Sequence, residues 1–73
     1  MYGYRIKLIV TYLPDQSVQV FYWNRDEQLW ADEEGGKLYP TARGGNIVLD
    51  KLFRKASYDP EERKEFTLYT AYN

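Results

Sequence analysis

Apolar and polar side chains alternate over four parts of the chain, and a period of two predicts β-strands. These predicted strands cover residues 4–13, 18–23, 28–32 and 65–72. Turn-forming residues follow the first strand, since Pro14 fixes a backbone angle and Asp15 and Ser17 hydrogen-bond to nearby backbone. A short additional strand is expected at residues 37–39, where Pro40 ends it.

One segment has the spacing of a helix instead. Its apolar residues recur every three or four positions, at Val48, Leu49, Leu52, Phe53 and Ala56. The residues between them are charged, namely Asp50, Lys51, Arg54 and Lys55. Either Thr41 or Asn46 can cap the start of this helix. We favour Asn46, because a start at Thr41 puts Gly44 and Gly45 inside the helix, which is costly.

The order of these elements predicts an α+β fold with a single antiparallel sheet. A three-stranded meander is followed by one main helix and a closing C-terminal strand. Packing the helix on one face of the sheet is the economical arrangement. We expect one small domain over residues 1–73, with a core rich in rings, because the chain has eight Tyr, three Phe and two Trp residues.

Turn lengths predict which side chains share a face. Four-residue loops at 14–17 and 24–27 would place Leu13 opposite Val18 and Trp23 opposite Gln28. Both registers put the same bulky residues on one face, which we call the inner face and expect beneath Leu49, Leu52 and Phe53 of the helix. The inner face is predicted to contain Ile6, Leu8, Val10, Phe21, Trp23, Trp30, Phe66 and Leu68.

The opposite, outer face is the candidate partner-binding surface. A solvated sheet face should be mostly polar, yet this one holds apolar residues with charged residues along one side. Such a patch indicates a contact surface, although Tyr and β-branched residues also favour strands wherever they point. The candidate partner-binding residues are Arg5, Lys7, Ile9, Val20, Tyr22, Leu29 and Tyr69. The acidic turns, with Asp26, Glu27, Asp32, Glu33 and Glu34, are an alternative contact.

The chain contains no residue set that identifies a catalytic or metal site. It has no Cys and no His, which excludes disulfides, zinc sites built on those residues, and nucleophilic catalysis by Cys or a Ser–His pair. Acidic residues 32–34 could hold a hard cation, but the ligand spacing of an EF-hand loop is absent. Residues 43–46 could hold an anion, but the phosphate-loop pattern is missing. We expect a chain that is not an enzyme and takes no cofactor or metal.

Charge and hydropathy narrow the class of partner. The net charge of −1 argues against binding nucleic acid by charge alone. No apolar run approaches the roughly 20 residues of a membrane span, and the first residues lack the layout of a signal peptide. We expect cytoplasmic residence, no membrane partner, and a protein partner or a homodimer, because open sheet edges invite pairing. Single-stranded nucleic acid stacked on Tyr22 and Tyr69 is the alternative.

No residue motif identifies a family. The chain nevertheless resembles the small proteins that bacteriophages and mobile elements encode, anti-CRISPR proteins among them. It shares their small size, their lack of Cys and an order of a β-meander followed by a helix. Many such proteins occlude a surface of a host complex. The resemblance, which is one of size and style, implies a non-enzymatic inhibitor or regulator.

Overall fold

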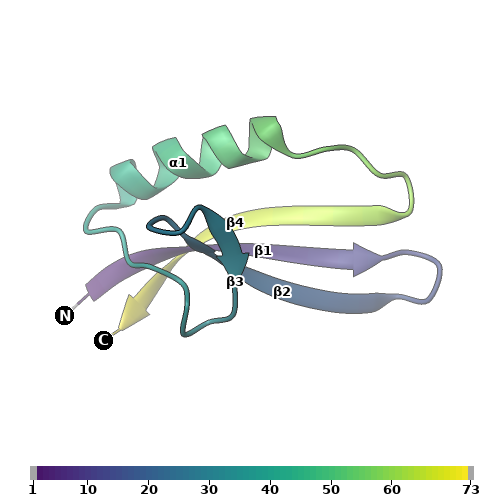
Figure 1. The fold of residues 1–73 in the computed structure, drawn as a ribbon, viewed down its shortest axis with the longest axis horizontal. Coiled ribbons are helices and arrows are strands. Elements are labelled where there is room, and N and C mark those ends of the chain that lie inside the picture. The colour runs from purple at the N-terminus through teal and green to yellow at the C-terminus, as the bar shows by residue number, and fades with distance from the viewer. Residues whose placement is uncertain (1, 73) are drawn as a thin grey trace.

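Four strands and one helix make up the structure, a computed structural model that describes residues 2–72. The elements are β1 (Tyr2–Tyr12), β2 (Ser17–Asn24), β3 (Leu29–Ala31), α1 (Ala42–Lys55) and β4 (Glu62–Tyr72). The strands form one antiparallel sheet in the order β3-β2-β1-β4. The helix packs against one side of this sheet (Figure 1). The predicted α+β fold is confirmed.

The hairpin between β1 and β2 is displaced from its predicted register by two residues. Tyr12 pairs with Ser17 and Leu8 with Phe21, so the loop is 13–16 and the predicted pairing of Leu13 with Val18 is wrong. The cause is Gln16, which adopts a left-handed φ of 61° and donates its side-chain amide to the Leu13 carbonyl at 2.8 Å. Because side chains alternate with a period of two, a shift of two residues leaves every residue on its predicted face.

The second hairpin differs from its prediction in the same way. Trp23 pairs with Trp30 rather than with Gln28. Gln28 also has a left-handed φ, of 56°, and its side-chain amide donates to the Arg25 carbonyl at 2.7 Å. The strand β3 is three residues long, shorter than the predicted 28–32. The predicted strand at 37–39 is a single bridge, in which Tyr4 and Tyr39 exchange backbone hydrogen bonds of 2.9 and 2.7 Å.

The helix begins earlier than predicted. Thr41 is the N-cap, and its hydroxyl accepts a hydrogen bond from the Gly44 N–H at 3.1 Å, so the prediction of Asn46 is wrong. Gly45 lies inside the helix because the helix approaches β4 closely there. A Cβ atom on Gly45 would lie 2.6 Å from Leu68 Cδ1. Close contact between helix and strand therefore accounts for a residue that disfavours helices.

The core lies between α1 and the inner face. Ile6, Trp23 and Tyr39 are buried at its centre. Partly buried residues surround them, namely Tyr4, Trp30, Val48, Leu49, Leu52 and Leu68. The predicted inward orientation of both indole rings is confirmed. Phe53 contacts the inner face as predicted, through Phe66 at 5.6 Å between ring centres, but 60% of the residue remains exposed. The helix ends two residues later, and the chain leaves Phe53 uncovered.

Candidate functional site

The outer face is partly covered, contrary to expectation. Tyr22 is only 9% exposed, so the prediction that its ring faces solvent is wrong. The segment between β3 and α1 crosses this residue, and a Cβ atom on Gly36 would lie 2.7 Å from Tyr22 Cβ. The Arg5 guanidinium donates to the Gly36 carbonyl at 3.3 Å and holds the segment in place. The two adjacent glycines at 35 and 36 were the only sequence signal of this close approach.

Tyr69 and Lys7 complete this covered end of the outer face. The Tyr22 and Tyr69 rings meet edge to face at 6.0 Å, and the Lys7 ammonium lies 5.6 Å from the Tyr69 ring centre. Burial raises the pKa of Tyr22, and the neighbouring Tyr69 adds to the rise. Tyr22 already contacts Tyr69 and the covering segment, which leaves little of Tyr22 for a partner.

The remaining candidates on the outer face lie in two separate places. Ile9 pairs with Val20, and Val20 is 42% exposed. Leu29 is equally exposed but pairs with Asn24, four residues farther along β2, which is a distance of about 13 Å. The structure therefore brings Arg5, Lys7, Tyr22 and Tyr69 together, and it separates Leu29 from Ile9 and Val20.

The inner face has a larger apolar opening than the outer face, because the helix that covers it is shorter than the strands. A 14-residue helix is about 21 Å long, whereas an 11-residue strand is about 36 Å long. In Figure 1 the strands β1, β2 and β4 continue well past the end of α1. Comparing predicted element lengths could have revealed this opening from the sequence.

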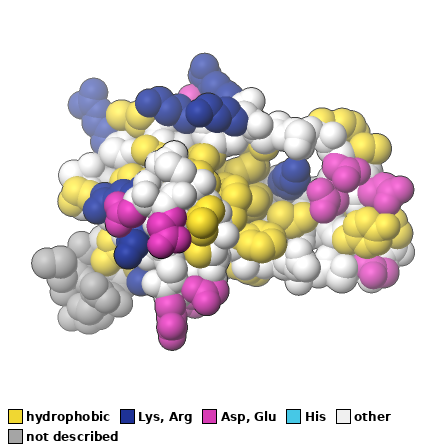
Figure 2. Space-filling model, in the orientation of Figure 1, with side chains coloured by type: hydrophobic (Ala, Val, Ile, Leu, Met, Phe, Trp, Pro, Cys, Tyr) yellow, Lys and Arg dark blue, Asp and Glu magenta, His cyan; other side chains and the backbone are white. Residues whose placement is uncertain are grey.

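Two adjoining pockets mark the opening, and both are lined by Ala56, Ser57, Lys64 and Phe66. One pocket, of about 360 Å³, lies over the sheet and adds Trp30, Lys55 and Leu8 to that lining. The other, of about 310 Å³, lies against Phe53. We call this opening the aromatic groove and define it by Leu8, Trp30, Phe53, Lys55, Lys64 and Phe66. Figure 2 shows apolar side chains gathered in the middle of this side of the molecule, between the helix and the strands.

The rings of the groove form a continuous series of contacts. Trp23 and Trp30 meet at 5.1 Å between ring centres, Trp30 and Phe66 at 6.0 Å, and Phe66 and Phe53 at 5.6 Å. The series runs from the buried core to the exposed Phe53. Each such pair adds about 0.5–1.5 kcal/mol beyond area burial. Trp30 and Phe66 are therefore each held between two neighbouring rings, whereas Phe53 contacts one ring of the series and is otherwise exposed.

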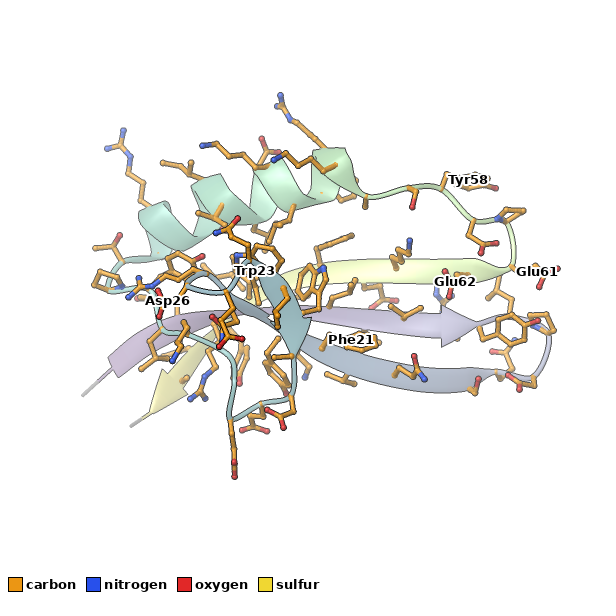
Figure 3. All side chains as sticks on the ribbon, viewed as in Figure 1. Phe21, Trp23, Asp26, Tyr58, Glu61 and Glu62 are labelled. Atoms are coloured by element: carbon orange, nitrogen blue, oxygen red, sulfur yellow. The ribbon has the colours of Figure 1, made fainter. Side chains whose placement is uncertain are left out.

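The rim of the groove carries one lysine from each side, Lys55 from α1 and Lys64 from β4. The Lys64 ammonium donates to the Ser57 carbonyl at 2.9 Å and lies 4.0 Å from the Glu62 carboxylate. Lys55 is exposed in the last turn of α1, beside Arg54. At the far end, Figure 3 places Tyr58, Glu61 and Glu62 around the start of β4. The Tyr12 hydroxyl donates there to the Glu61 carboxylate at 2.9 Å.

The acidic turns form local contacts. The Asp26 carboxylate lies 3.7 Å from Arg25 and 4.0 Å from Lys37, and the Asp32 carboxylate accepts the Gly35 N–H at 2.9 Å. Within residues 2–72, no group of three or more His, Cys, Asp or Glu residues is arranged to hold a metal ion. The one helix in that range is too short and too polar to cross a membrane.

Comparison with known proteins gives no relative from which a function could be transferred. The chain has no significant match to a protein-family model, to a curated protein or to a solved structure.

Proposed function

We propose that this chain is a non-enzymatic, cytoplasmic protein-binding module, an inhibitor or regulator of the kind that covers a surface of a host protein complex. The observation that supports this proposal is the aromatic groove, which stays open because α1 is too short to cover the sheet. Groups of exposed rings with a polar rim are typical of protein contact surfaces. The groove, rather than the outer face around Tyr22, is the contact that we propose.

The residues that line the aromatic groove indicate which side chains a protein partner would present to it. Two pockets lined by rings accept apolar or aromatic side chains, and the exposed Lys55 at the rim favours a neighbouring carboxylate. Burying one Leu or Phe side chain contributes about 1.5–3 kcal/mol, whereas micromolar binding needs about 8 kcal/mol. A short peptide therefore binds weakly, and the natural partner is expected to present apolar anchors beside acidic residues on a broader surface.

Selection from a multivalent phage-displayed library of random peptides tests this proposal, because multivalency makes weak binding detectable. Peptides captured by the immobilised chain are expected to combine an aromatic or aliphatic anchor with Asp or Glu. Phe53→Ser and Lys55→Glu should each reduce capture, because they remove a ring and reverse a charge at the groove. Circular dichroism should show that each variant still folds, since Phe53→Ser also removes the ring contact with Phe66.

Leu29→Ser is the matched control, because Leu29 is an exposed apolar residue on the outer face, away from the groove. It should leave capture unchanged. Capture that survives Phe53→Ser but is lost in Leu29→Ser would place the contact on the outer face and contradict the groove.

Single-stranded nucleic acid is a second candidate ligand for the same groove. Half-buried Trp30 and Phe66 lie beside Lys55 and Lys64, and stacking on such rings contributes about 1–3 kcal/mol per base. Fluorescence anisotropy of a labelled oligonucleotide at two salt concentrations distinguishes the candidates. Binding that weakens steeply with salt would favour nucleic acid, and we expect no such binding.

A further inference from the structure

The strand β2 forms an open edge of the sheet along more than half of its length. The strand β3 pairs only with Tyr22, Trp23 and Asn24. On that side, Ser17–Phe21 has no neighbouring strand within residues 2–72. In Figure 1 this part of β2 is the lower margin of the sheet, with no other element of residues 2–72 beyond it. Its outward N–H and C=O groups are available to another strand.

The sequence of this open edge favours strand addition. No charged residue occurs between Asp15 and Arg25, and the segment holds two Val residues and a Phe without Pro or Gly. The exposed fractions of Val18 and Val20 are 57% and 42%. Proteins usually protect such edges with charges, Pro or bulges. Those protections are missing here, and strand-forming residues without charge are the ones that pair most readily.

The opposite edge, formed by β4, is protected. It begins with Glu62, Arg63, Lys64 and Glu65. Charges along an edge strand disfavour the approach of another strand. The helix also packs on this strand, where Leu68 contacts Gly45. The two edges therefore differ in both composition and covering.

We propose that a second copy of this chain pairs with Ser17–Phe21 in an antiparallel arrangement about a two-fold axis at Gln19. Gln19 then lies opposite Gln19 of the partner subunit, and Val18 lies opposite Val20 of the partner subunit. The symmetric contact pairs apolar with apolar and amide with amide, and brings no charges together. Both sheets merge into one, with the two helices on the same face. The inference uses the edge of β2 and does not depend on the aromatic groove.

Because Gln19 would lie opposite Gln19 of the partner subunit, a charge placed at this position would meet its own copy. Sedimentation equilibrium, which measures the fraction of dimer, therefore tests the proposal. The wild-type chain should shift from monomer to dimer as its concentration rises. Gln19→Lys and Gln19→Glu each place like charges opposite each other, so each should weaken dimerisation by roughly tenfold or more. An equimolar mixture of the two variants should dimerise at least as well as the wild type, because opposite charges then meet. Gln19 is exposed, and circular dichroism should show an unchanged fold.

Thr67→Glu is the matched control, since it adds the same charge at the middle of the other edge, opposite Lys7. It should leave dimerisation unchanged. A wild-type chain that stays monomeric at every concentration overturns the proposal. So does a dimer that Gln19→Lys leaves intact, a mixture that fails to restore pairing, or an equal loss in Thr67→Glu.

Discussion

The sheet has two halves with similar sequence patterns and different surroundings. In the half beneath α1, Ile6 is fully buried, and the segment around Gly36 covers Tyr22 on the outer face. In the half beyond α1, Val10 of β1 is still buried between β2 and β4, whereas Val18 and Val20, on the outer face of the open edge, remain largely exposed. Alternation therefore predicts a strand, whereas burial depends on whether strands flank it and whether another element covers its face. The half without a covering helix contains the open edge and borders the groove.

The largest expected effect tests the difference in burial between the two halves. Ile6→Ala should lower the free energy of unfolding by about 2–5 kcal/mol, because it leaves a cavity in the covered half. Val20→Ala should cost less than about 1 kcal/mol, since little buried area is lost. Urea unfolding of both variants measures the two values, and similar losses would contradict the contrast.

The covering of Tyr22 gives the next largest effect. Gly36→Ala places a Cβ atom against Tyr22 and should lower the free energy of unfolding by about 1–3 kcal/mol. Glu34→Ala is a control in the same segment, and its exposed side chain should change stability by less than about 0.5 kcal/mol. A Gly36→Ala chain as stable as the wild type would mean that the segment is not held against Tyr22.

The start of the helix that covers the first half is tested by a smaller change. Thr41→Ala removes the side-chain cap and should cost about 1 kcal/mol. Asn46→Ala should be neutral or slightly stabilising, because Asn46 lies in the helix and Ala favours helices. Thermal unfolding of the pair measures both, and a larger loss for Asn46→Ala would restore the start predicted from the sequence.

The smallest effect concerns alkaline pH. Burial raises the pKa of Tyr22 in the folded chain above its unfolded value of about 10. The resulting stabilisation is fully present below about pH 10 and is lost as the pH rises through the folded pKa. Tyr22→Phe should therefore reduce the alkaline loss of stability, measured as urea midpoints on both sides of pH 10. A wild-type chain and a variant with identical alkaline loss would contradict the burial of this hydroxyl.

The sequence was sufficient to predict the sheet, its helix and the orientation of most strand residues. The orientation survived two wrong registers, because Gln16 and Gln28 each displaced the pairing by two residues. Nothing in the pattern indicated that a Gln would take a left-handed backbone. The covering of Tyr22 and the exposure of Phe53 depend on long-range packing between segments, which alternation alone does not describe.

The two hairpin loops are built alike, each with four residues and a Gln in the last position. The side-chain amide of that Gln closes the loop onto the carbonyl three residues earlier, in 13–16 as in 25–28. Because both ends of this hydrogen bond lie within the loop, the geometry of the loop depends on its own residues. One device, a glutamine that bonds back across its own loop, therefore serves both hairpins, although the other three residues of the two loops differ.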